Sequence, residues 1–284
     1  MRILLAIVHY WKPEAKATHS SLEENPRPRI DALQAQLLSL RRQMGNQGLL
    51  NITKKAVEDT NSSLKHHIDV RLITDGKNHV ADQLDEHYQG ITDMVVVKPS
   101  NPRHLGFLAQ QYLASELSSN YDLYGYMEDD LVINDPIFFS KIHWLQHEMQ
   151  EKAIVLPNRY EQANFPSRLD KLYIDGPFPI NELRKIIPEP ALPIQTKQAG
   201  GTLRLESPLN PHAGCFFLTP AQLLFWTKQT HWQDGDCAFV SPLESAATLG
   251  IAKTFNLYKT SQDFASWLEI QHWGNWFSKL ITNV

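Results

Sequence analysis

The hydrophobic and polar positions of residues 1–156 follow two alternating patterns. Short apolar runs bounded by polar or turn residues predict buried strands. They lie at 2–8, 68–74, 93–98, 123–127 and 153–156. Between these runs, apolar positions recur with helical spacing at 29–44, 79–88, 102–118 and 136–150. Strands that alternate with helices indicate an α/β fold, with a mostly parallel open sheet and helices on both faces.

The pattern changes at about Pro157, where prolines and aromatic residues become frequent. We expect a strand over 212–218 that leads into a helix beginning after Thr219. A second helix is expected to begin after Ser241. In both places a proline follows the hydroxyl residue, and Ser or Thr followed by proline is a common start of a helix.

Composition excludes some classes of function. The chain has 284 residues, enough for one large α/β domain with a substantial core. Its formal net charge of −4 disfavours a nucleic-acid partner, because no basic surplus is available to neutralise a phosphate backbone. The two cysteines have neither metal-ligand nor disulfide spacing, and no apolar run approaches the length of a membrane span. We expect a cytoplasmic protein without a transmembrane segment, and peripheral attachment to a membrane stays open.

Three consecutive carboxylates, Glu128, Asp129 and Asp130, follow directly on the apolar run at 123–127. Such a cluster is costly unless a cation neutralises it. Mn²⁺ and Mg²⁺ prefer oxygen ligands and often share them with substrate phosphates, and ligands of open α/β sheets usually bind at the carboxyl ends of strands. The pattern therefore predicts a site for a divalent metal and a diphosphate. The alternative is a solvated acidic turn before the next helix, with Asp135 as the N-cap of that helix.

The order of these elements resembles that of the GT-A glycosyltransferases, which move sugars from nucleotide-sugar donors. The strand that ends in the three acids is similar to their DxD-type motif, in which a carboxylate binds a divalent metal that bridges the two donor phosphates. Asp75 and Gly76 follow the second strand, similar to the Asp-Gly pair of many members. The resemblance implies that residues 1–156 bind the nucleotide-sugar, and that residues 157–284 form the acceptor-binding and catalytic part of the same domain.

The resemblance also implies which residues contact the donor. Six are expected at the nucleotide-sugar: His9, Tyr10, Asp75, Arg103, Glu128 and Asp129. Among them, Asp75 is expected to contact the base, and Arg103, at the start of a helix beside His104, to lie near the base or the phosphates. Asp129 is expected either to accept a hydrogen bond from the donor ribose or to hold Asp130 in place.

The metal ligands that the resemblance implies are Asp130 and His272, with Mn²⁺ or Mg²⁺ as the cofactor. His272 lies in a C-terminal segment that is similar to the His-Gly-Lys-Trp signature of some retaining members. The alternative for His272 is a histidine packed among tryptophans and satisfied by one backbone carbonyl. His212 is a second candidate ligand.

An inverting transfer needs a base that takes the proton from the acceptor hydroxyl. Glu244 is the candidate, because the resemblance places the base of inverting members on this helix. Ser241 and Glu244 are also spaced as a capping box, so a role in capping alone is the alternative. Asp234 and Asp236 are the other candidates for the base.

The sequence therefore predicts a metal-dependent glycosyltransferase, taken here as inverting, that moves a sugar from a nucleotide-diphosphate-sugar to a hydroxyl of an unknown glycan or other acceptor. A nucleotidyltransferase on a similar sheet is the first alternative. Against it, the segment after the first strand lacks the Gly-rich, basic loop that such enzymes usually have there. The second alternative is a non-catalytic sugar-binding protein on a decayed transferase fold, against which the intact acidic triplet argues.

Overall fold

A five-stranded sheet forms the centre of the computed structural model, which describes residues 1–14, 20–44, 47–162, 169–198 and 200–281. The strands lie in the order β13-β6-β1-β4-β5. Their bounds are Cys215–Leu218 (β13), Leu123–Glu128 (β6), Arg2–Val8 (β1), His67–Thr74 (β4) and Asp93–Val96 (β5). The strands β6, β1, β4 and β5 run parallel, and β13 runs antiparallel to β6. The predicted α/β fold with a mostly parallel open sheet is confirmed.

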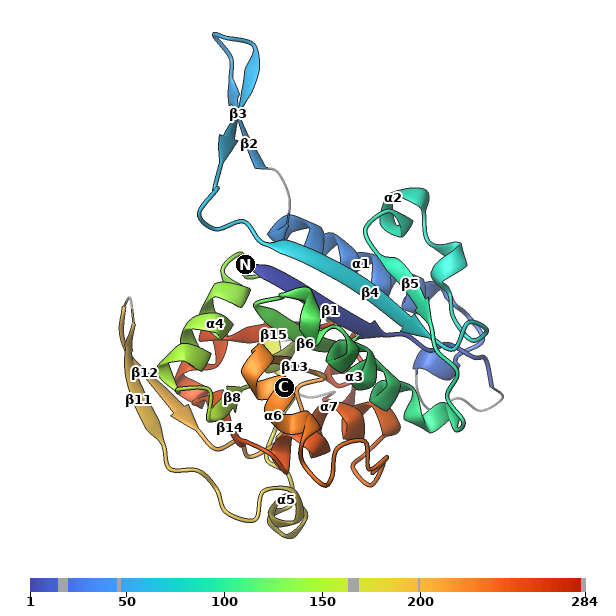
Figure 1. The fold of residues 1–284 in the computed structure, drawn as a ribbon, viewed down its shortest axis with the longest axis vertical. Helices are drawn as coiled ribbons and strands as arrows, with labels where there is room; N and C mark the ends of the chain where they lie inside the picture. The colour runs from blue at the N-terminus through green and yellow to red at the C-terminus, as the bar shows by residue number, and fades with distance from the viewer. Residues whose placement is uncertain (15–19, 45–46, 163–168, 199, 282–284) are drawn as a thin grey trace.

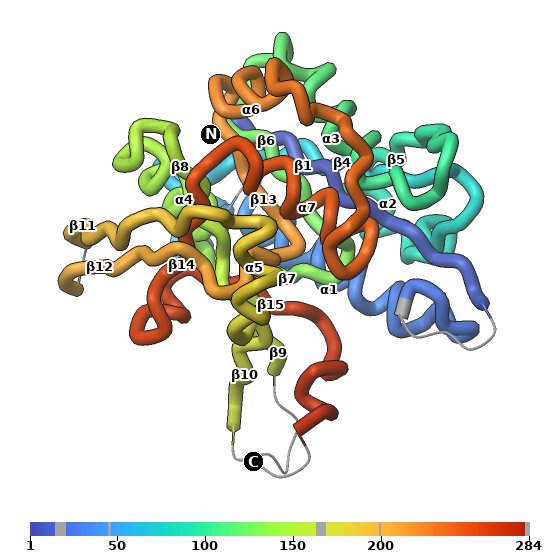
Figure 2. The backbone as a smooth tube through the Cα atoms, turned by 90° about the horizontal axis from the view of Figure 1, so that it is seen from below, coloured from blue at the N-terminus to red at the C-terminus, as the bar shows by residue number. Residues whose placement is uncertain are grey.

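Helices cover both faces of this sheet (Figures 1 and 2). The helices α3 (Leu105–Ser115) and α6 (Pro220–Thr227) lie over one face, and α1 (Arg27–Gln43) lies over the other. Every residue of β1 from Ile3 to Val8 is fully buried. A strand that is covered on both faces has no polar side, which explains the unbroken apolar run at the start of the chain.

Two further sheets join the two halves of the chain, in the orders β10-β9-β15-β7 and β11-β12-β14-β8. Their strands are β7 (Leu131–Val132), β8 (Ala153–Val155), β9 (Asn158–Gln162), β10 (Lys171–Tyr173), β11 (Ile194–Gln198), β12 (Gly201–Glu206), β14 (Asn256–Thr260) and β15 (Glu269–His272). Because β7 pairs with β15 and β8 pairs with β14, strands from residues 1–156 share sheets with strands from residues 157–284. The predicted division of donor and acceptor binding between these parts stays a prediction.

The other helices are α2 (Glu86–Gln89), α4 (Phe138–Glu148), α5 (Ile180–Ile186) and α7 (Pro242–Ala252). Two helical predictions were too long. The segment 79–88 forms a 3-10 turn at Ala81–Gln83 and the single turn α2, and the segment 102–118 forms α3 with a 3-10 turn at each end. The prediction of Asp135 as an N-cap was wrong. The cap of α4 is Ile137, and the Asp135 carboxylate instead accepts from the Ile137 N–H and from Lys141.

Both helix starts predicted in the second part of the chain are confirmed. The Thr219 hydroxyl accepts from the Gln222 N–H, and the Gln222 side chain accepts from the Thr219 N–H, which completes a capping box on α6. At the start of α7, the Ser241 hydroxyl accepts from the Glu244 N–H at 3.3 Å. This cap determines where α7 begins, and it places Glu244 in the first turn.

A separate hairpin extends away from the body of the molecule (Figure 1). Its strands are β2 (Gln47–Asn51) and β3 (Ala56–Thr60), and they form a two-stranded sheet of their own. The sequence pattern did not predict this hairpin. None of the helices in the described ranges is long and apolar enough to cross a membrane.

The packing of α3 against α7 leads to a first prediction, on Gly106. A Cβ at this position would lie 2.6 Å from the Ala246 Cβ and 2.8 Å from the Tyr126 hydroxyl oxygen. Such overpacking typically costs about 1–3 kcal/mol, while the helix propensity of Ala over Gly returns only about 1 kcal/mol. The 2.6 Å approach favours the upper part of that cost, so Gly106→Ala should lower the free energy of unfolding by about 1–2 kcal/mol, measured by urea denaturation.

The matched control is Gly176→Ala, because a Cβ on Gly176 meets nothing within 4 Å. This variant should stay within about 0.5 kcal/mol of the wild type. Equal effects of the two substitutions would contradict the close approach of α3 and α7.

Candidate active site at the end of strand β6

The second carboxylate of the triplet, Asp129, is held by two basic side chains. The register of β6 against β1 pairs Glu128 with Val8, so the next residues, Asp129 and His9, leave the sheet side by side. The His9 Nδ1 donates to Asp129 Oδ2 at 2.5 Å, and Arg29, from the first turn of α1, donates to Asp129 Oδ1. Burial alone would raise the pKa of Asp129, but the charge of Arg29 and the hydrogen bond from His9 lower it below the ordinary value.

His9 is fully buried, and both of its ring nitrogens have protein partners. Nε2 accepts from the Val80 N–H at 3.0 Å, so the ring proton lies on Nδ1, which faces Asp129. In this arrangement His9 positions a carboxylate, and it presents no free polar edge to a ligand. Its predicted contact with the nucleotide-sugar stays a prediction.

The third carboxylate, Asp130, lies between Arg29 and His272. Its Oδ2 is 3.3 Å from Arg29 Nη1 and 3.8 Å from His272 Nε2. The pairing of β15 with β7 brings this histidine to the strand end, because His272 is the register partner of Leu131. Asp130 Oδ1 is buried and has no hydrogen-bond partner among the described residues. Two predicted metal ligands are thus side by side, although they are far apart in the sequence.

Glu161, on β9, fixes the orientation of His272. This fully buried carboxylate accepts from His272 Nδ1 at 3.2 Å, from the N–H groups of Phe277 and Ser278, and from the Ser278 hydroxyl. Burial alone would raise the pKa of Glu161, but the hydrogen bonds from His272 and Ser278 lower it to about 2. The ionised carboxylate keeps the proton of His272 on Nδ1 and leaves Nε2 facing Asp130. Sequence reasoning missed Glu161, because no local motif marks it.

The first carboxylate, Glu128, points to a different part of the molecule. It packs against Gly214, where a Cβ would lie 2.9 Å from Glu128 Oε2 and where φ is +64°. Burial, and after it the charge of Asp130, raises the pKa of Glu128 well above the ordinary value. Glu128 Oε1 is 4.0 Å from His212 Nε2 and has no hydrogen-bond partner among the described residues. The three acids therefore occupy three different environments.

Glu244 and His212 form a second pair close to Glu128. Glu244 Oε1 is 3.5 Å from His212 Nε2, and the Glu244 side chain is 21% exposed whereas His212 is buried. Burial, and after it the charge of Arg159, lowers the pKa of His212 well below the ordinary value. A neutral imidazole therefore lies beside the carboxylate of Glu244. His212 thus faces Glu244 and Glu128. Its role as a second candidate metal ligand stays a prediction.

A buried cationic network supports this second pair. Arg159 donates twice to Asp175 Oδ1, at 2.8 and 3.0 Å, and Lys259 donates to Asp175 Oδ2 at 2.7 Å. Lys259 also donates to the carbonyl oxygen of His212 at 2.7 Å. Two buried cations share one carboxylate here, so the network has an excess of positive charge that favours carboxylates nearby. The charge of Arg159 acts on both Glu128 and Glu244.

The remaining predicted residues make no contact with the acidic triplet, His212 or His272 that the structure shows. Asp75 accepts from the N–H groups of Lys77 and Asn78 and from the Asn78 side chain, so its carboxylate closes its own turn. Tyr10 is half-buried, and Arg103 is exposed at the start of α3. Asp234 and Asp236 both pair with Lys253, at 2.7 and 2.8 Å, as a partly exposed surface turn.

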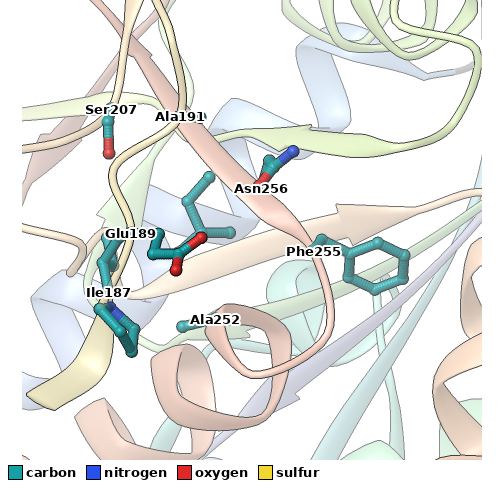
Figure 3. A pocket seen from close by; sticks show the side chains of 9 residues that line it. Ile187, Glu189, Ala191, Ser207, Ala252, Phe255 and Asn256 are labelled. Carbon is teal, nitrogen blue, oxygen red and sulfur yellow. The ribbon is translucent and has the colours of Figure 1, made fainter.

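The pocket in Figure 3 is separate from these side chains. It has a volume of about 270 Å³ and lies between the connector after α5 and the end of α7 with the start of β14. Its lining residues are Ile187, Pro188, Glu189, Ala191, Ser207, Ala252, Phe255, Asn256 and Leu257. None of them belongs to the acidic triplet or its partners. Among the described residues, no group of three or more His, Cys, Asp or Glu side chains is arranged so that it could hold a metal ion.

Comparison with known proteins gives a likeness of fold alone. No protein-family model matches the chain, and no curated protein matches it. It is similar to the crystal structure of S. aureus TarS residues 1–349 in complex with UDP-GlcNAc, with a TM-score of 0.42 and 11% identity over 92% of this chain and 56% of that chain. For a longer TarS structure the TM-score is 0.41 at 11% identity, over 92% of this chain and 35% of that one. The matched region spans about half of the TarS 1–349 chain and about a third of the longer TarS chain.

The contacts of Glu161 lead to a second prediction. Glu161→Gln removes the charge and turns an amide group toward backbone and hydroxyl donors. Amide hydrogens of β15 and the residues after it should then exchange roughly tenfold faster or more, since charge-assisted hydrogen bonds contribute about 1.5–3 kcal/mol. Glu182→Gln is the control, because Glu182 forms only an exposed pair with Lys185. Unchanged exchange in the Glu161 variant would refute the role of this carboxylate.

The same contacts predict a dependence on pH. The pKa of Glu161 is lower in the folded protein than its ordinary value of 4.5, so the ionised form stabilises the fold. This stabilisation should be complete above pH 4.5 and should be lost as the pH falls toward 2. The opening free energy of the segment, corrected for intrinsic exchange rates, should follow this course in the wild type. In Glu161→Gln it should show a clearly smaller change over the same range.

Proposed function

We propose that this chain is a metal-dependent glycosyltransferase that moves a sugar from a nucleotide-diphosphate-sugar to an acceptor hydroxyl. The observation that supports it most directly is the pair Asp130 and His272 at the carboxyl end of β6, with Glu161 behind the histidine. A carboxylate oxygen and an imidazole nitrogen that is oriented by a second carboxylate are a common ligand arrangement in metal sites. The strand end is also the usual ligand position in an open α/β sheet.

The residues present fit a divalent ion such as Mn²⁺ or Mg²⁺. Asp130 Oδ1 is buried without a hydrogen-bond partner among the described residues, and His272 Nε2 faces the same carboxylate. Asp130 and His272 would hold the ion, and water and the donor phosphates would complete its coordination. When bound, the ion would stabilise the negative charge that develops on the leaving diphosphate.

Arg29 and Asp129 are proposed to hold Asp130 in position. Arg29 contacts both Asp129 and Asp130, so it offsets the repulsion between the two carboxylates and fixes their orientation. Of the two roles expected for Asp129, its contacts favour the one in which it holds Asp130 in place, here through Arg29. The guanidinium also reduces the repulsion that a diphosphate would meet at an acidic strand end.

Glu244 is proposed as the base of an inverting reaction. Its carboxylate is partly exposed, lies in the first turn of α7, and has the neutral ring of His212 beside it. A helix N-terminus favours the ionised carboxylate that a base needs. Glu244 would take the proton of the acceptor hydroxyl as the hydroxyl oxygen attacks the anomeric carbon, and the nucleoside diphosphate would leave.

The donor is proposed to lie across the carboxyl ends of β1, β4 and β6. Tyr10, Asp75 and Arg103 are the residues proposed near the base and the phosphates. Residues 157–284 are proposed to bind the acceptor, a glycan or another hydroxyl compound.

Both cysteines are unpaired, which fits the reducing, cytoplasmic setting expected from the sequence. Analysis of the products distinguishes a glycosyltransferase from the alternative, a nucleotidyltransferase. Sugar transfer releases a nucleoside diphosphate, and nucleotidyl transfer releases pyrophosphate.

A third prediction tests the ligands. Asp130→Asn and His272→Gln should each weaken Mn²⁺-dependent binding of a nucleoside diphosphate at least tenfold, because each removes one of two protein ligands. Thermal unfolding with UDP, GDP, ADP and CDP, with and without Mn²⁺, measures this. Asp234→Asn serves as the control, since Asp234 pairs with Lys253 in a surface turn. Transfer activity that persists in EDTA, or binding that survives both substitutions, would count against the proposal.

A fourth prediction separates catalysis from capping at Glu244. Glu244→Gln keeps the size of the side chain but cannot take a proton, so kcat should fall roughly a hundredfold or more with little change in melting temperature. Ser241→Ala, which removes the cap of α7, should cost about 1 kcal/mol of stability while kcat stays within a few fold of the wild type. Normal turnover in Glu244→Gln would leave this residue as part of the helix start only.

A further inference from the structure

The β2–β3 hairpin exposes an unusual amount of apolar surface. Leu49, Leu50, Ile52 and Val57 are between 60% and 79% exposed. The hairpin extends away from the body and has a sheet of its own (Figure 1). An isolated two-stranded hairpin is only marginally stable in water, and clustered exposed apolar side chains mark a surface that contacts something else.

The apolar side chains lie on more than one side of the hairpin. The strand register pairs Leu50 with Val57 and Leu49 with Glu58. Successive residues of a strand point to opposite faces, so Leu50 and Val57 share one face and Leu49 lies on the other. Ile52 lies in the turn at the tip. A protein surface docked on one face would leave apolar groups on the opposite face in water, whereas a medium that surrounds the tip would cover them all.

Basic residues accompany these apolar groups. The segment from Arg41 to His67 contains five lysines and arginines and only two acids, in a chain whose net charge is −4. Lys54 and Lys55 follow Ile52 in the turn. Arg41 and Arg42 are exposed in the last turn of α1, shortly before the hairpin in the chain. Apolar side chains flanked by cations on long stems suit the boundary between acyl chains and anionic headgroups.

We propose that the β2–β3 hairpin inserts its tip into the interface of an anionic lipid bilayer. Leu49, Leu50, Ile52 and Val57 enter the acyl boundary, and Lys54 and Lys55 reach the headgroup phosphates. This inference rests on the hairpin alone, and it holds or fails independently of the glycosyltransferase proposal.

Cosedimentation of the full chain with vesicles tests it. The wild type should bind phosphatidylglycerol-containing vesicles at least tenfold more tightly than pure phosphatidylcholine vesicles, and high salt should weaken this binding. Leu50→Ser with Ile52→Ser should reduce binding tenfold or more, because two apolar side chains no longer leave water. Lys54→Gln with Lys55→Gln should reduce binding several-fold without changing the apolar surface.

The control is Leu192→Ser with Leu209→Ser, two exposed leucines outside the hairpin, and it should bind as the wild type does. Circular dichroism and the melting temperature establish whether each variant is folded. If the apolar variant does not fold, the lysine variant still tests the proposal. The proposal is overturned if the wild type does not bind anionic vesicles, or if the hairpin variants bind as well as the control. It is also overturned if the wild type self-associates through these residues, with Leu50→Ser and Ile52→Ser giving monomers that bind vesicles unchanged.

Discussion

The burial of three consecutive carboxylates at the end of β6 is the constraint on which the candidate site depends. Each of the three carboxylates is accommodated by a different environment. Glu128 is in a buried environment that favours the neutral form, and Asp129 is held by His9 and Arg29. Asp130 lies between Arg29 and His272 and keeps one carboxylate oxygen without a hydrogen-bond partner among the described residues. Of the three, Asp130 therefore combines a contact to Arg29 with a carboxylate oxygen that is left for a cation.

This constraint couples distant parts of the chain. Arg29 connects α1 to the acidic turn, and Glu161 connects β9 to His272 and to the residues that follow β15. A second centre, Glu244 with His212, is supported by the buried cations Arg159 and Lys259. The two centres flank the same strand end, since Glu128 lies near the second centre and Asp130 belongs to the first. In the proposed transfer reaction, the donor diphosphate would bind at the first centre and the acceptor hydroxyl would lie at the second.

Local signals predicted much of the fold, and long-range contacts account for what was missed. The apolar runs of β1, β4 and β6 and the hydroxyl–proline starts of α6 and α7 are encoded within a few residues, and they were predicted. The hairpin was missed because its strands are exposed on both faces and lack the alternation of a half-buried strand. Family resemblance suggested Asp130 and His272 as partners, whereas Arg29 and Glu161 were missed, since each becomes significant only through a residue about a hundred positions away. The burial of His9 likewise depends on tertiary packing.

The position of a bound metal tests the central claim most directly. Crystals grown with Mn²⁺ and a nucleoside diphosphate would show the ion in an anomalous difference map recorded at the manganese absorption edge. The account predicts a single strong peak in contact with the carboxylate of Asp130 and with Nε2 of His272, next to the diphosphate. A peak at another place in the molecule, or a diphosphate bound at the end of β6 without any peak beside Asp130, would contradict it.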